Sequence, residues 1–155
     1  MALALATFVS QNKGADRVDR IRKGVFYANL MDIFFAIGIT IFVYLFSKNM
    51  IHLMSGSNSE VVLYNGSTYL KIASPFFTIL GVLFNLRYAL QALGEKVIPL
   101  VSSIIEFFGK IIFVIFIVPK LGYFGVMICE PLIWIVMTGQ LAWAFYGNGY
   151  IRKKI

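Results

Sequence analysis

Four long apolar segments constrain the fold of this chain more than any other feature of its sequence. They cover residues 25–46, 68–90, 98–118 and 123–145, and charged or helix-breaking residues bound each of them. A helix needs about 20 mainly apolar residues to cross the hydrocarbon core of a bilayer, and each segment meets that length. We therefore predict an all-α, polytopic membrane helix bundle with four full transmembrane helices.

The composition favours the same class of protein. The 155 residues are 59% hydrophobic and only 14% charged, whereas soluble domains carry about 25% charged residues. A shorter apolar run, residues 1–12, is interpreted as the end of a truncated fifth helix, because its positive charges follow it and those of a signal peptide would precede it. Between the first two spans, residues 47–67 are expected to form one or two short helices along the membrane interface.

Basic residues indicate how the chain lies across the membrane. If the loop after residues 1–12 is cytoplasmic, most Lys and Arg side chains fall on that side: Lys13, Arg17, Arg20, Arg22, Lys23, Arg87, Lys96, Arg152, Lys153 and Lys154. This bias follows the positive-inside rule. We predict a multi-pass protein of the cell (inner or plasma) membrane, surrounded by membrane lipids, with a cytoplasmic C-terminus. The basic stretch then anchors the chain, and we expect no nucleic-acid partner.

Three ionisable residues inside the predicted spans form the candidate substrate or cavity site. Glu106 and Lys110 are four residues apart and share one helix face, with the acid before the base. Glu130 lies in the following span. Because an ionisable side chain costs a few kcal/mol in lipid, each needs a partner or a purpose. Two interpretations stay open: structural pairing with a neighbouring helix, or contact with protons or substrate in an aqueous cavity.

We also make predictions for four other residues in the spans. Pro75 and Pro131 are predicted to kink the second and fourth spans. Asp32, in the first span, is expected to pair with cations of the basic loop. Arg87 is expected to extend its charged end to the membrane interface.

The sequence contains no pattern typical of a catalytic or metal centre. Its one histidine, His52, and its one cysteine, Cys129, are far apart, which leaves no nucleophile paired with a base and no cluster of metal ligands. A glycine-rich phosphate loop is also missing. We therefore predict that the protein is not an enzyme and needs no metal or cofactor.

Several motifs in order resemble the multidrug and toxic compound extrusion (MATE) transporters. The stretch "ATFVSQNKGADRVDRIRKG" is similar to the family's helix end and basic loop, and "RYALQALGEKVIP" to its inside turn. "IIEFFGKIIF" resembles a motif of the C-terminal lobe, with Lys110 where Arg is usual, and "GYFGVMICEPLIWIV" resembles the last helix. The loop motif falls here on Gln11, Asn12, Gly14 and Arg20.

The resemblance implies a fold of twelve helices in two lobes, of which residues 1–155 would form part of the C-terminal lobe. It also implies the export of small organic cations in exchange for sodium ions or protons. On this interpretation the chain is a fragment of a multidrug efflux antiporter, lacks its N-terminal lobe and does not transport alone. Some relatives carry a cation-binding acid in the tenth helix, and "YLKIASPFFTILGVLFN" has none.

Two alternatives to the antiporter fragment stay open at this point. A lipid-linked saccharide flippase of the same superfamily would need several cations in its cavity to hold pyrophosphate. A small membrane protein with an assembly or regulatory role would need no substrate site at all.

Overall fold

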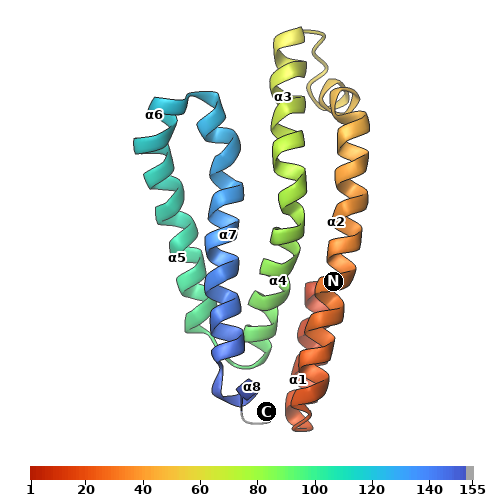
Figure 1. Cartoon of the computed structure of the whole chain (residues 1–155), viewed down its shortest axis with the longest axis vertical. Coiled ribbons are helices and arrows are strands. Elements are labelled where there is room, and N and C mark those ends of the chain that lie inside the picture. The colour runs from red at the N-terminus through yellow and green to blue at the C-terminus, as the bar shows by residue number, and fades with distance from the viewer. Residues whose placement is uncertain (153–155) are drawn as a thin grey trace.

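The structure is a computed structural model that describes residues 1–152, and it consists of helices joined by short turns (Figure 1). The α-helices are α1 (Ala2–Gly14), α2 (Val18–Ser55), α3 (Glu60–Ala73), α4 (Phe77–Ala92), α5 (Val97–Ile112), α6 (Val118–Leu121), α7 (Tyr123–Gly147) and α8 (Gly149–Arg152). A 3-10 turn, Ser74–Phe76, joins α3 to α4, and a π-helical turn, Phe113–Ile117, joins α5 to α6.

Within residues 1–152, four helical segments are long and apolar enough to cross a membrane. They are Val18–Ser55, Glu60–Ala92, Val97–Leu121 and Tyr123–Gly147, and they contain the four predicted spans. The prediction of an all-α, multi-pass membrane bundle is therefore confirmed. Large apolar side chains of the third segment, such as Phe107, Ile112 and Phe116, are more than half exposed, which suits a surface that faces lipid.

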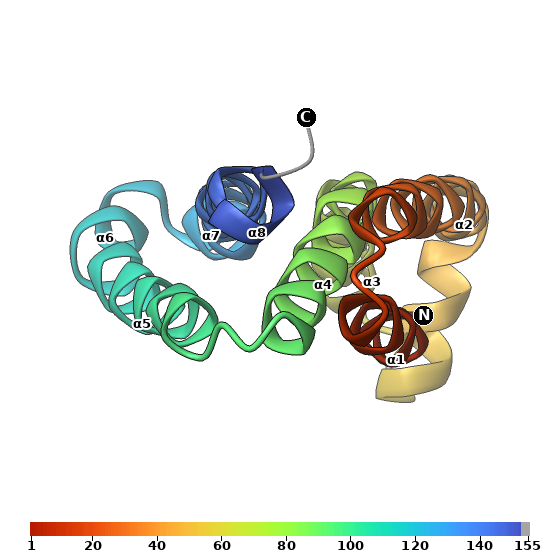
Figure 2. The same cartoon turned by 90° about the horizontal axis from the view of Figure 1, so that it is seen from below.

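Helix α4 lies between two groups of helices (Figure 2). One group contains α1 and α2, and the other contains α5 and α7. Side chains from α1, α2, α4 and α7 form a common hydrophobic core, in which Val9, Ile21, Leu90, Leu141 and Phe145 have at most 1% of their surface exposed. Helix α4 is thus the element through which the two groups are held together.

The connection between the first two spans differs from the prediction. The expected interfacial helices are not formed, because α2 continues to Ser55 and α3 begins at Glu60. The 38 residues of α2 rise about 57 Å, well beyond the hydrocarbon thickness. Gly56, in the left-handed conformation with φ 62°, ends α2 and donates its N–H to the carbonyl of His52. The turn that remains is only four residues long, 56–59.

The predicted proline positions have different local structures. At Pro75 the helix passes through the 3-10 turn, and Thr40 Oγ1 of α2 donates to the carbonyl oxygen of Ser74 at 3.0 Å. At Pro131, α7 continues as an α-helix on both sides. The π-helical turn was not predicted. It precedes Pro119, which has no N–H to donate, and the N–H of Val118 bonds the carbonyl of Phe113 five residues back.

Polar contacts tie the helix ends together at the lower end of Figure 1. Lys13 Nζ donates to the carbonyl oxygen of Leu93 at 2.6 Å, and Arg22 donates to the carbonyl oxygen of Ile151. The Tyr150 hydroxyl donates to Asp16 Oδ1 at 3.1 Å. Burial, followed by this hydrogen bond, raises the pKa of Tyr150 above its ordinary value. Helix α8 is therefore docked against the α1–α2 turn.

Cysteine labelling tests this arrangement of turns. In a Cys129→Ala background, we introduce Ala15→Cys in the α1–α2 turn, Gly149→Cys in α8 and Asn58→Cys in the α2–α3 turn. The fold places the first two at one end of the bundle and the third at the other. A membrane-impermeant thiol reagent added to sealed vesicles should label either the first two or the third. Labelling of Ala15→Cys and Gly149→Cys from opposite sides would contradict the fold.

The docking of α8 should depend on the protonation of Tyr150. Because the folded pKa is raised, the neutral phenol contributes stability at all pH values below about 10, the ordinary Tyr value. That contribution is lost as the pH rises through the raised folded pKa. We expect Tyr150→Phe to lower the thermal stability by a constant small amount below pH 10 and by nothing well above it. Tyr64→Phe, at an exposed position, is the control, and a deficit that persists at alkaline pH would refute the assignment.

Candidate functional site

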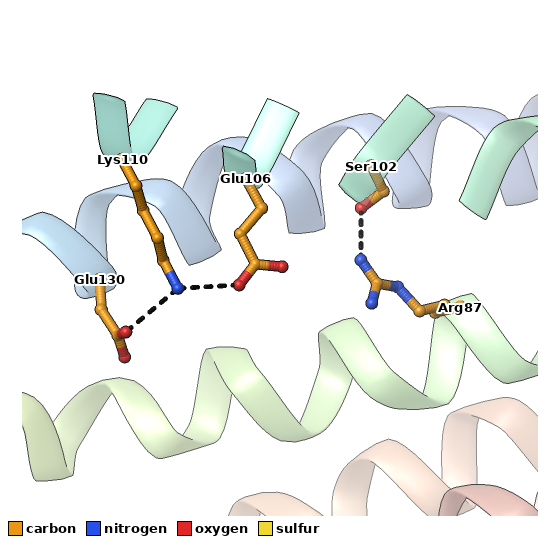
Figure 3. Close-up of polar contacts among 5 residues, drawn as sticks. All are labelled: Arg87, Ser102, Glu106, Lys110 and Glu130. Atoms are coloured by element: carbon orange, nitrogen blue, oxygen red, sulfur yellow. Dashed lines mark hydrogen bonds and ion pairs between the residues drawn. The ribbon is translucent and has the colours of Figure 1, made fainter. Parts of the chain in front are cut away.

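The structure brings Glu106, Lys110 and Glu130 together, and we call these three residues the Lys110 cluster (Figure 3). Glu106 and Lys110 lie one turn apart on α5, and Lys110 Nζ is 3.0 Å from Glu106 Oε1. Glu130 extends from α7, and its Oε1 is 3.3 Å from the same nitrogen. One ammonium group therefore bridges carboxylates from two neighbouring helices.

The charges of the Lys110 cluster do not cancel. Two carboxylates and one ammonium leave one negative charge in excess, within segments that are apolar enough to span a membrane. The three side chains are also not sealed inside the bundle, because 34% to 41% of each side-chain surface is exposed. Such a group of charges can hold two helices together, and its exposed side can also contact a ligand.

A second polar contact lies one turn away along α5. Arg87 of α4 donates from Nη2 to Ser102 Oγ at 3.2 Å (Figure 3). Ser102, Glu106 and Lys110 follow one another at intervals of four residues, so they line the same face of α5. Glu106 also borders a cavity of about 250 Å³. Arg87, Glu106 and Trp134 are among the residues that line it.

The contact of Arg87 differs from the prediction. Arg87 was expected to extend to the membrane interface, but its guanidinium turns toward α5 and its Nε is buried without a hydrogen-bond partner. The four-residue spacing from Ser102 to Lys110 was the signal in the sequence for a polar face of α5. The sequence carried no signal that Arg87 would meet that face, because this contact depends on how α4 and α5 pack.

Asp32 also differs from its predicted partner. It was expected to pair with cations of the basic loop, yet its Oδ2 accepts a hydrogen bond from Asn85 Nδ2 of α4 at 2.7 Å. Within the described part of the chain, 1–152, both ion pairs are those of Lys110. The prediction was wrong because helix α2 turns Asp32 toward α4 and away from the loop at its own beginning.

The loop motif lies away from the Lys110 cluster. Gln11, Asn12 and Gly14 belong to the end of α1, and Arg20 lies in the first turn of α2. Asn12 is buried, and its side-chain Nδ2 donates to the backbone carbonyl of Phe8. The backbone carbonyl of Asn12 accepts a hydrogen bond from the N–H of Arg17 at 2.9 Å. Gln11 and Arg20 are exposed. Asn12 thus shapes the turn between α1 and α2.

The fold and the partly exposed charges define the class of protein first: a multi-pass helical membrane protein with a charged site between its spans. A comparison with protein families identifies it more narrowly, because the model of the MatE family matches residues 1–117. This match covers most of the chain, which therefore belongs to the MatE family of membrane transporters. Members of the family are transporters and not enzymes. Neither the curated proteins nor the solved structures gave a match.

The matched residues include only part of the site. They contain Glu106 and Lys110, whereas Glu130 and Pro131 lie in α7, beyond residue 117. The resemblance seen in "GYFGVMICEPLIWIV" thus falls outside the matched range, and Glu130 enters the site through its contact with Lys110.

Removing the central cation of the Lys110 cluster should destabilise the bundle. Lys110→Met leaves two carboxylates near each other without compensation, and we expect it to lower the free energy of unfolding by about 1–3 kcal/mol, less than for a fully buried pair because of the exposure. The triple variant Glu106→Gln, Lys110→Met, Glu130→Gln should regain most of the loss. Unfolding in mixed detergent measures both.

Lys48→Met is the matched control, since Lys48 is an exposed residue of α2. It should leave the unfolding free energy within about 0.5 kcal/mol of the original value. If Lys110→Met unfolded with the same free energy as this control, the two ion pairs would not contribute to the stability of the fold.

Proposed function

We propose that this chain forms part of a cation-coupled antiporter that exports small organic cations, with the Lys110 cluster facing the transport pathway. The bridging of two carboxylates by one ammonium supports this proposal more than any other observation. It leaves an excess negative charge at membrane depth, on side chains that are about two-fifths exposed. Such a site attracts cations and repels anions.

The geometry suggests how the site would exchange its ligands. Lys110 lies nearly equidistant from its two partners, at 3.0 and 3.3 Å. An organic cation that approaches one carboxylate would replace the ammonium there, while Lys110 keeps its contact with the other. The coupling ion, a sodium ion or a proton, and the organic cation would favour different states of the transporter, and this difference is what exchange requires.

The same charge argues against the flippase alternative. A lipid-linked saccharide carries pyrophosphate, which needs an excess of cations around it. In the Lys110 cluster the carboxylates outnumber the ammonium group, and Arg87 is engaged by Ser102. The cluster thus favours an organic cation as the exported compound.

The placement of the chain is part of the proposal. We place it in the inner or plasma membrane, with the α1–α2 turn, the α4–α5 turn and the C-terminus in the cytoplasm, since most cations lie at that end. Membrane lipids cover its apolar exterior. Alternating access needs one bundle to move against another around a shared site. We therefore propose an N-terminal lobe as the partner and expect no transport by residues 1–155 alone.

Export of a fluorescent organic cation such as ethidium tests the proposal. The transporter that contains this chain, with its partner lobe, is expressed in cells, and the initial rate of efflux is measured. Glu130→Gln removes the excess negative charge and should reduce efflux at least about tenfold. Lys110→Arg keeps the bridge and should retain most of it, whereas Lys110→Met should not.

Glu60→Gln is the control, because Glu60 is exposed at the beginning of α3, outside the cluster. It should export at the original rate. Unchanged efflux in Glu130→Gln at equal expression would refute the role of the cluster, and export by residues 1–155 without a partner would refute the need for a second lobe.

A further inference from the structure

A second polar cluster lies within the bundle, on the opposite side of α4 from the Lys110 cluster. We call it the Asn85 cluster: Asn29 and Asp32 of α2 with Asn85 of α4. Asn85 Nδ2 donates to Asn29 Oδ1 at 3.0 Å and to Asp32 Oδ2 at 2.7 Å. Two acceptor oxygens from α2 thus converge on the side-chain NH2 group of Asn85.

The charge at this point is not compensated. Within residues 1–152, no Lys, Arg or His nitrogen forms an ion pair with Asp32. Counted from residue 25, where the first predicted span begins, Asp32 lies about 10 Å into the hydrocarbon. A carboxylate at that depth with only amide partners is costly, and a cation that binds there would remove much of the cost.

The side-chain oxygen of Asn85 supplies an independent observation that points to a ligand. Its side chain is fully buried, with 0% of its surface exposed, yet its Oδ1 has no hydrogen-bond partner. An amide with an unpaired oxygen in the bundle is destabilising as it stands. Rotation of the amide would exchange its nitrogen for this oxygen, so that three oxygens would converge where two now do.

The backbone of α4 comes close to this cluster at Gly81. Gly81 lies one turn before Asn85 on α4, and a Cβ atom on Gly81 would be 3.1 Å from Cβ of Asp32 and 3.4 Å from its Oδ2. The missing side chain lets α4 approach the carboxylate closely. Asp32 and Gly81 border a cavity of about 290 Å³, which Phe35 and Phe84 also line.

We propose that the Asn85 cluster is a sodium-ion site, in which the oxygens of Asn29, Asp32 and Asn85 are the ligands. Carboxylate and amide oxygens are the donors that hard cations prefer, and one carboxylate balances one monovalent charge. The site extends the proposed function, because it binds the coupling ion at a place separate from the organic cation. The inference depends on the proposed function only where it assigns the sodium ion the role of coupling ion. Binding itself can be measured without transport.

Binding of radioactive sodium ions to the purified transporter in detergent tests the site. The original protein should show saturable binding that excess unlabelled NaCl removes and KCl or choline chloride does not. Asp32→Asn should weaken binding at least about tenfold, because it removes the only charged ligand. Asn29→Ala keeps the charge and should weaken binding about threefold or more, so a ligand role remains measurable if Asp32→Asn does not fold.

Glu60→Gln is the matched control, since Glu60 is an exposed acid at the beginning of α3, outside both clusters. It should bind sodium ions as the original protein does. Saturable binding that survives both Asp32→Asn and Asn29→Ala would overturn the proposal, as would binding lost in Glu60→Gln alone, binding that KCl displaces equally well, or no saturable binding. None of these results would alter the expected efflux defect of Glu130→Gln, so the two proposals can fail separately.

Discussion

This structure depends on one constraint, which is that the hydrocarbon core of a bilayer provides no hydrogen-bonding partners. In lipid every backbone N–H and C=O must find its partner within the protein, and for a chain of this kind helices meet that need. The same constraint selects the side-chain contacts. Thr40 bonds the carbonyl of Ser74 beside Pro75, and Thr138 of α7 bonds the carbonyl of Ile79 at 3.4 Å. Polar groups inside the bundle therefore connect one helix to the next.

Helix α4 shows how these contacts organise the fold. On one side Asn85 bonds two residues of α2, and on another Arg87 bonds Ser102 of α5. Its apolar residues Leu86 and Leu90 are buried in the shared core. Interhelical hydrogen bonds in membranes are each worth about 0.6 kcal/mol, so they matter more for register than for stability. They fix how α2, α4 and α5 are turned relative to each other and hence which charges meet.

The sequence predicted the features that depend on neighbours along the chain. Length and apolar content gave the four spans, and the four-residue spacing gave the contact between Glu106 and Lys110, because both follow from the geometry of one helix. The partners of Glu130, Arg87 and Asp32 depend instead on the rotation of one helix against another, which the spacing of residues does not encode. The prediction for residues 47–67 failed for a related reason. Polar residues beyond the hydrocarbon favour turns but do not prevent a helix from continuing, since water can solvate it.

The most direct measurement of the central claim is solid-state NMR of the transporter in a lipid bilayer, with nitrogen-15 in the lysine Nζ and carbon-13 in the glutamate carboxyl groups. If Lys110 bridges the two acids, its Nζ should show dipolar coupling to two carboxyl carbons, because the N–O distances are 3.0 and 3.3 Å. One of the two signals should disappear in Glu106→Ala and the other in Glu130→Ala. A Lys110 nitrogen that couples to neither carbon would contradict a charged site held together between membrane-spanning helices.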